Sequence, residues 1–153
     1  MQLNYLLIDD NPLTNRVHKA LFEQTGTAKY IHCSGTGQDA LDYLTESGEF
    51  EDNLKTYLLP HLIFLDINMQ EMNAWEFMKK YNELQIGLKA QIVIIMLSTS
   101  INPKDEALAM KIKEINGFEH KPLTNETLTT ILSKYFGYKP QLDNSCVPAG
   151  INV

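Results

Sequence analysis

The chain has 153 residues, a length typical of one domain and sufficient for a substantial hydrophobic core. Hydrophobic residues make up 44% and charged residues 21% of the sequence, which fits a soluble globular protein and excludes wholesale disorder. Lys and Arg number 13 against 19 Asp and Glu, so the net charge is −6, and Arg16 is the only arginine. Because a nucleic-acid surface needs clustered cations, we expect no nucleic-acid partner.

The N-terminal stretch "MQLNYLLIDD" lacks a basic region, and two acids interrupt its apolar run. It therefore matches neither a signal peptide nor a membrane span, and we expect no membrane association. The two cysteines, Cys33 and Cys146, form neither a metal-ligand spacing nor a disulfide framework. These features favour a reducing, cytoplasmic location.

Short apolar runs alternate along the chain with segments that have helical spacing. The first run, residues 4–8, predicts a strand. Pro12 then suits the first turn of a helix that Gly26 ends. The residues of this helix that we expect to face the core are Val17, Ala20 and Leu21.

The middle of the chain predicts two further strands and a loop. Residues 28–33 form a weak strand, suited to a sheet edge, and residues 36–48 have the spacing of a helix. A polar stretch over 49–61 is interpreted as a surface loop, because it is longer than most connections. The third strand is predicted at 62–66.

The second half continues the alternation, with helices at 73–84, 103–115 and 124–136 and strands at 91–98 and 117–120. Five strands and five helices in strict alternation predict an α/β fold, a doubly wound parallel sheet with helices on both faces.

We expect one domain over residues 1–137. Residues 138–153 carry two prolines and little periodicity, so we expect a mobile C-terminal tail.

Polar residues follow the strands at the edge of the sheet where ligands of such folds gather. These residues are Asp9, Asp10, Asp66, Ser98, Thr99 and Lys121. Three neighbouring carboxylates repel one another unless a cation lies among them, and oxygen ligands suit Mg²⁺. A lysine and a hydroxyl could then contact a phosphoryl group. The chain has no glycine-rich phosphate loop, so a phosphoryl group would have to be bound covalently, with a carboxylate as the nucleophile.

Simpler interpretations remain open from these residues alone. Asp9 and Asp10 could cap the following helix, and Lys121 could be a solvated surface residue. Phe118 could simply pack in the core. The four histidines form no ligand spacing and no catalytic triad, so we interpret them as structural or surface residues. Trp75 is expected to pack rather than to bind a cofactor.

Four motifs carry a resemblance to a known family, namely "LLIDDN", "LIFLDINMQEMNAWEF", "IVIIMLSTS" and "GFEHKPL". With these motifs in this order, the chain resembles the receiver domain of two-component response regulators over about residues 3–137. The resemblance implies the flavodoxin-like receiver fold with strand order 2-1-3-4-5.

The resemblance also implies site roles. Asp66 would be the phosphoacceptor. Asp10, Asp66 and the backbone carbonyl of Asn68 would bind Mg²⁺ directly, and Asp9 would hold it through water.

Ser98 would be the hydroxyl that swings toward the phosphoryl group, and Phe118 would be the switch aromatic on the last strand. Lys121 would be the lysine of the site, and its peptide bond to Pro122 is typically cis in the family.

Some positions depart from the family pattern. Gln70 stands where proline is common, Ala74 where glycine is common and Thr99 where alanine is frequent. In the family, the positions that Asn68 and Ser100 occupy influence how fast the phosphoryl group is hydrolysed. Because neither Gln70 nor Ala74 supplies a reacting group, we expect the chemistry to survive these two departures and the loop geometry and phosphoryl lifetime to differ from the family pattern.

The resemblance implies a signalling protein rather than an enzyme, with only its own phosphorylation and dephosphorylation as chemistry. A phosphohistidine on a sensor kinase or phosphotransfer protein would be the donor. Because the chain ends shortly after the last helix, we expect a stand-alone receiver that binds a separate effector protein or passes the group on in a phosphorelay. The expected docking face comprises the fourth helix, fifth strand and fifth helix, which could also form a homodimer.

Two alternatives come from other classes. One is a receiver-like interaction module that works without phosphorylation, which the complete set of site residues disfavours. The other is an aspartyl hydrolase of the haloacid-dehalogenase type, which needs a second Asp where this chain has Asn68.

Overall fold

The computed structural model describes residues 1–45, 59–84 and 89–141. Its strands are β1 (Leu3–Ile8), β2 (Ala28–Ser34), β3 (Leu62–Asp66), β4 (Val93–Ser98) and β5 (Gly117–His120). Its helices are α1 (Pro12–Gln24), α2 (Gly37–Thr45), α3 (Ala74–Glu83), α4 (Pro103–Met110) and α5 (Asn125–Phe136), with a short 3-10 helix, η2 (Lys89–Gln91). The five predicted strands and five predicted helices are confirmed. Most of the loop predicted at 49–61 lies outside the described residues.

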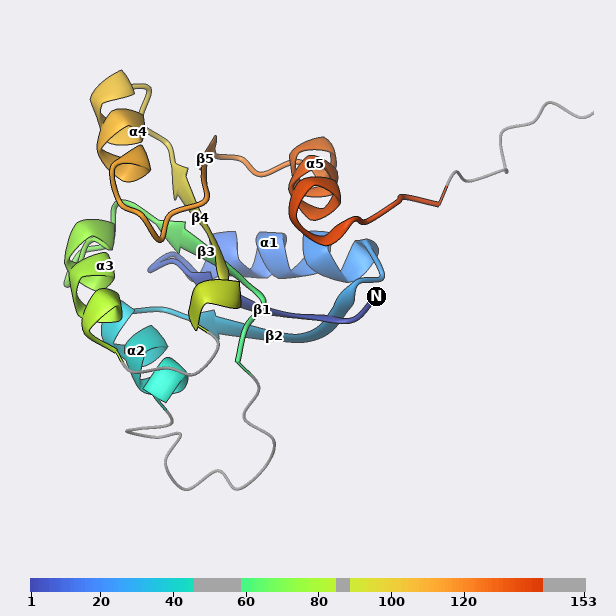
Figure 1. Ribbon diagram of the computed structural model, residues 1–153, viewed down its shortest axis with the longest axis horizontal. Helices are drawn as coiled ribbons and strands as arrows, with labels where there is room; N and C mark the ends of the chain where they lie inside the picture. Colours follow the sequence, from blue (N-terminus) through green and yellow to red (C-terminus); the bar gives the residue numbers. More distant parts are fainter. Residues whose placement is uncertain (46–58, 85–88, 142–153) are drawn as a thin grey trace, which may run out of the picture.

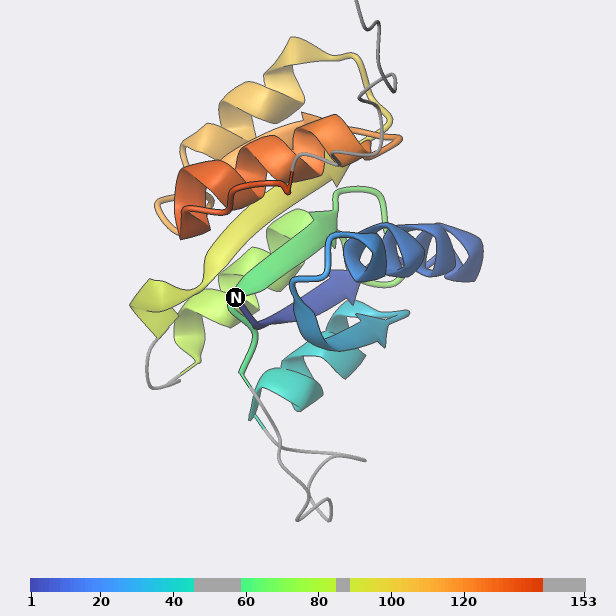
Figure 2. The same ribbon diagram turned by 90° about the vertical axis from the view of Figure 1, so that its right-hand side faces the viewer.

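The strands form one parallel sheet in the order β2-β1-β3-β4-β5. This order confirms the doubly wound topology, and Figure 2 shows the sheet behind helices α1 and α5. Because all the strands run the same way, their carboxyl ends meet at one edge of the sheet.

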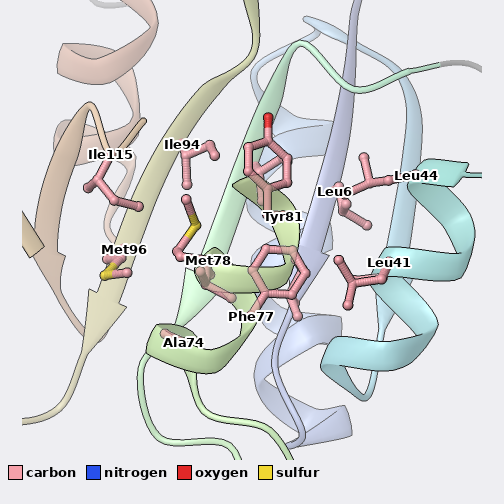
Figure 3. Close-up of a cluster of buried hydrophobic side chains, with 14 of the residues drawn as sticks. Leu6, Leu41, Leu44, Ala74, Phe77, Met78, Tyr81, Ile94, Met96 and Ile115 are labelled. Carbon is pink, nitrogen blue, oxygen red and sulfur yellow. The ribbon is translucent and has the colours of Figure 1, made fainter. Parts of the chain in front are cut away.

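Helices cover both faces of the sheet, with α1 and α5 on one side and α2, α3 and α4 on the other (Figure 1). The buried cluster on the first side, here called the α1/α5 core, comprises Leu3, Tyr5, Leu7, Phe22, Leu62, Phe64, Ile95, Leu97, Leu123, Leu128, Ile131 and Leu132. The α2/α3 core, part of which Figure 3 shows, comprises Leu6, Ile8, Ala40, Leu41, Tyr43, Leu44, Ile63, Leu65, Ile67, Met69, Ala74, Phe77, Met78, Tyr81, Ile92, Ile94, Met96, Ala109 and Ile115. Strand residues alternate between the two cores, as the pleat requires.

The predicted inward face of α1 is wrong for two of its three residues. Leu21 packs, half-buried, against the α1/α5 core, but Val17 is 56% exposed and Ala20 is also exposed. The buried residues of α1 are Asn15, His18 and Phe22. A hydrogen bond explains how a polar residue fits this face, because Asn15 Nδ2 donates to the Asp9 carbonyl at 2.9 Å.

The fourth helix is shorter than the predicted 103–115 segment, because α4 ends at Met110. The N–H groups of Lys111 and Ile112 bond three residues back, to Leu108 and Ala109, which tightens the last turn and stops the helix. The chain then places Ile115 in the α2/α3 core before β5 begins.

The end of α5 continues into residues that contact the domain. Tyr138 packs against the α1/α5 core, and its hydroxyl donates to the Thr25 carbonyl at 3.2 Å. The predicted tail therefore begins with an anchored residue. The division at residue 137 stays a prediction, and the mobility expected for 142–153 concerns residues outside the described ranges. In the described part of the chain, no helix combines the length and hydrophobicity needed to cross a membrane.

The burial of His18 makes a prediction for the pH dependence of stability. Burial lowers the pKa of this imidazole, and the Lys121 ammonium lowers it further while Asp9 opposes. The folded state therefore favours neutral His18. The contribution of this neutral imidazole to the free energy of unfolding is present above the unfolded pKa of about 6.5 and is lost as the pH falls below that value. We expect His18→Gln to flatten the decline in unfolding free energy between about pH 7.5 and pH 5, measured by urea titration.

The exposed His120 supplies the control for this measurement. His120→Gln makes the same replacement at the surface and shows what loss of an exposed imidazole does to the slope. Equal slopes for all three proteins would contradict the role assigned to His18.

Candidate functional site

Three carboxylates meet at the carboxyl edge of the sheet. Asp9 and Asp10 follow β1, and Asp66 ends the neighbouring strand β3. Each offers an oxygen within 4.8 Å of the others. Asp9 and Asp66 are only 4% and 5% exposed, whereas Asp10 faces solvent. The predicted acidic cluster is confirmed as a geometric feature, with a solvent-facing side.

The helix cap is Asn11, and the capping alternative for the two aspartates is wrong. Asn11 Oδ1 accepts from the N–H groups of Leu13 and Thr14. Asp9 instead accepts from the Asn11 N–H at 2.9 Å. An asparagine directly before a proline is a helix-start signal, so the sequence contained this information.

Lys121 connects two of the carboxylates. Its ammonium lies 2.5 Å from Asp9 Oδ2 and 2.9 Å from Asp66 Oδ1. The Lys121 N–H donates to the Ser98 carbonyl at 2.8 Å, which fixes the backbone from which the side chain reaches the acids. The Lys121–Pro122 bond is cis, as the resemblance implied.

Burial and neighbouring charges have opposing effects on the pKa values of Asp66 and Lys121. Burial raises the pKa of Asp66, and the negative charge of Asp9 adds to the rise, while hydrogen bonds from Lys121 and the Asn68 backbone lower it. Burial lowers the pKa of Lys121, but hydrogen bonds to the two aspartates outweigh it and the pKa is raised. The Lys121 ammonium is thus buried and shared by two carboxylates.

The charges of the site fit a divalent cation. Three carboxylates and one ammonium sum to −3 + 1 = −2, and the ligand atoms available are oxygens. Mg²⁺ prefers such hard ligands and few protein carboxylates, so Asp9, Asp10 and Asp66 could hold it. The contribution of the Asn68 carbonyl stays a prediction.

Gln70 makes a contact that sequence reasoning missed. Its backbone N–H donates to Asp10 Oδ2 at 3.1 Å and so orients the exposed carboxylate. Proline, which the family pattern favours there, has no N–H to donate. Ala74, the other departure in this loop, is the first residue of α3, where a helical backbone needs no glycine.

Ser98 and Phe118 lie on the same face of the sheet. Ser98 is fully buried, and its Oγ accepts from the Ser100 N–H at 2.9 Å. Ser98 pairs in register with His120, and Phe118 lies two residues before His120 and packs against the α2/α3 core. The rings of Phe118 and His120 contact edge to face, with centroids 5.5 Å apart.

Thr99, at the carboxyl end of β4, is exposed. It lines a cavity of about 340 Å³ with Lys121, Pro122 and the α1 residues Leu13, Thr14, Val17 and His18. This hollow opens beside the acidic cluster.

The comparisons with known proteins agree with this geometry. The family model for the response regulator receiver domain matches residues 5–133. A two-component response regulator from Cytophaga hutchinsonii has 25% identity and a TM-score of 0.76, over 90% of this chain and all of its own. A receiver protein from Dyadobacter fermentans has 25% identity and a TM-score of 0.72, over 87% of this chain and 97% of its own.

The phosphorylated cyanobacterial phytochrome response regulator RcpA, at 20% identity, shares the fold with a TM-score of 0.72 over 93% of this chain and all of its own. No curated protein matches this sequence. The family model spans most of the chain, and the fold has the predicted strand order. The chain therefore belongs to the response regulator receiver domain family of two-component signalling.

Proposed function

We propose that this receiver accepts a phosphoryl group on Asp66 from a phosphohistidine of a sensor kinase or phosphotransfer protein, with Mg²⁺, in the cytoplasm. One observation carries the proposal. The Asp66 carboxylate is fixed at the mouth of the sheet by Lys121 at 2.9 Å, beside the oxygens of Asp9 and Asp10. Positioning of this kind supplies much of phosphoryl-transfer catalysis.

In the transfer step, a carboxylate oxygen of Asp66 attacks phosphorus and forms the O–P bond. The N–P bond of the donor breaks, and its electrons stay on the imidazole nitrogen. Lys121 then balances charge on the phosphoryl oxygens. Bound Mg²⁺ would neutralise the carboxylates and the incoming oxygens, with Asp10, Asp66 and the Asn68 carbonyl as direct ligands and Asp9 holding it through water. The chain acts as a phosphoacceptor rather than as a turnover enzyme.

The proposed switch passes from Ser98 to the face formed by α4, β5 and α5. Ser98 Oγ accepts one hydrogen bond in the structure, so its own O–H can donate to a phosphoryl oxygen. Movement of Ser98 would disturb His120, its partner in register, and hence the ring of Phe118. A repacked α4-β5-α5 face would bind an effector protein or a second copy of the chain.

The mass of the intact protein tests the proposal directly. Incubation with acetyl phosphate and Mg²⁺ should add one phosphoryl group to the native chain and none to Asp66→Asn. A metal-free sample supplies the second control. If no adduct forms under any condition, including with sensor kinases, the alternative of a phosphorylation-independent interaction module is favoured.

Metal binding can be measured separately from phosphorylation. Trp75 follows Ala74 at the start of α3 and packs, half-buried, against the α2/α3 core. We expect Mg²⁺ to change the fluorescence of Trp75. Asp10→Asn should weaken the apparent affinity for Mg²⁺ by about tenfold or more, because a carboxylate ligand is lost.

Asp42→Asn, which makes the same charge change on α2, should leave the titration unchanged. A Mg²⁺ response that Asp10→Asn leaves intact would contradict the assignment of this carboxylate as a ligand.

A further inference from the structure

A second cavity lies at the opposite edge of the sheet from the acidic cluster. Its volume is about 410 Å³, and its lining residues are Tyr81, Lys89, Ile92, Lys113, Glu114 and Asn116. Ile92 and Asn116 directly precede β4 and β5, which places the cavity at the amino ends of these strands. A volume of this size suits a small organic molecule.

The hydroxyl of Tyr81 is an unsatisfied polar group in the wall of this cavity. The side chain is 0% exposed, and Oη has no hydrogen-bond partner among the residues that the structure describes. Figure 3 shows this hydroxyl at the end of the ring that points away from Phe77 and Ala74. Burial raises the pKa of Tyr81, and the negative charge of Glu114 adds a smaller rise, to about 12 in all. The hydroxyl is therefore neutral and can donate a hydrogen bond. A buried donor without an acceptor is costly, and a ligand acceptor would satisfy it.

The charged and apolar groups of the cavity indicate the class of ligand. Lys89 lies 4.7 Å from the centroid of the Tyr81 ring, and Lys113 is exposed at the rim. Glu114 is the one acid among the described lining residues, whose charges sum to +2 − 1 = +1. Ile92 and the ring of Tyr81 supply an apolar wall. One excess positive charge beside an apolar wall fits an organic monoanion better than a phosphate dianion.

Hydrogen bonds hold the cavity wall in place before any ligand arrives. Asn116 Oδ1 accepts from the Ile94 N–H, and the Asn116 N–H donates to the Ile94 carbonyl, both at 2.8 Å. The Asn116 carbonyl accepts from the Tyr135 hydroxyl at 2.8 Å. A preformed wall reduces the entropy that a ligand must lose on binding.

We propose that this cavity is a binding site for a small organic carboxylate, whose oxygens accept from the Tyr81 hydroxyl and face the ammonium groups of Lys89 and Lys113. The site is separate from the phosphoacceptor and does not depend on the function proposed above.

The test is an NMR titration of the full chain with benzoate and, separately, with hexanoate, in buffer without Mg²⁺. We expect amide shifts at Tyr81, Ile92 and Asn116 and none at the acidic cluster. Benzamide, which lacks the charge, should bind at least about tenfold more weakly than benzoate.

Variants separate the site from general charge effects. Tyr81→Phe should weaken benzoate binding by about tenfold without lowering the unfolding midpoint, because the hydroxyl it removes has no partner among the described residues. Lys113→Gln should weaken binding by about three- to tenfold, and the matched Lys111→Gln, two residues away and outside the lining, should leave it unchanged.

Three results would overturn the proposal. They are an absence of shifts with both carboxylates, equal effects of Lys111→Gln and Lys113→Gln, or a crystal grown with benzoate that has only a water molecule at Tyr81 Oη.

Discussion

Replacing Lys121 with methionine is expected to slow phosphoryl transfer to Asp66 by about 10²–10³-fold. Methionine keeps a long unbranched side chain but has no charge. The variant therefore loses the cation that contacts Asp9 and Asp66 and that would balance the phosphoryl oxygens. The measurement is the rate at which the phosphoryl adduct appears with acetyl phosphate and Mg²⁺, followed by intact mass.

The pH profile of the same variant gives a second readout. Lys121 lowers the pKa of Asp66 against the effect of burial, so its removal raises that pKa further. Because the ionised carboxylate is the nucleophile, the rate of Lys121→Met should fall off at a higher pH than the native rate as the solution is acidified. Lys104→Met, on exposed α4 surface, is the matched control. A native rate in Lys121→Met would contradict the assigned role.

Replacing Phe22 with alanine is expected to lower the free energy of unfolding by about 3–5 kcal/mol. Phe22 is the buried aromatic of α1. Its ring stacks on Tyr5 with centroids 4.7 Å apart and an interplanar angle of 1°, and it lies 5.0 Å from the Phe64 ring. Alanine would leave a cavity between α1 and the sheet, and urea titration would measure the loss.

Leu13→Ala, on the same helix, provides the comparison. Leu13 is 63% exposed, so its replacement should change stability by no more than about 0.5 kcal/mol. Similar losses for the two variants would mean that α1 does not pack on the sheet through Phe22.

The architecture could be predicted from the sequence because the alternation of strands and helices and the helical periodicity are strong signals in an α/β chain. The orientation of α1 could not. Hydrophobicity points to Val17 and Ala20, whereas the buried face contains Asn15 and His18. Periodicity counts apolar side chains and cannot register that the Asn15 side-chain amide donates to the Asp9 carbonyl.

For the site, the sequence likewise predicted which residues come together but not the contacts that orient them. Strand ends identified the acidic residues and Lys121, because parallel strands deliver their carboxyl ends to one edge. The contacts that orient them were not predictable, since the Gln70 N–H that reaches Asp10 is a backbone group with no signature in the side-chain sequence. The Tyr81 hydroxyl, likewise, lacks a partner in the described part of the chain because of what surrounds it in three dimensions, which the sequence does not show.

The alternation of strand residues between the two cores has a consequence for how this chain can vary. Leu62 and Phe64 belong to one core, Ile63 and Leu65 to the other, and Asp66 takes the next place in that alternation. A single-residue insertion within β3 would reverse the parity of every side chain on one side of it and turn Asp66 away from Lys121. Insertions or deletions of an odd number of residues in this strand should therefore disrupt the site. Conservative replacements of its apolar residues leave Asp66 on the same face of the sheet.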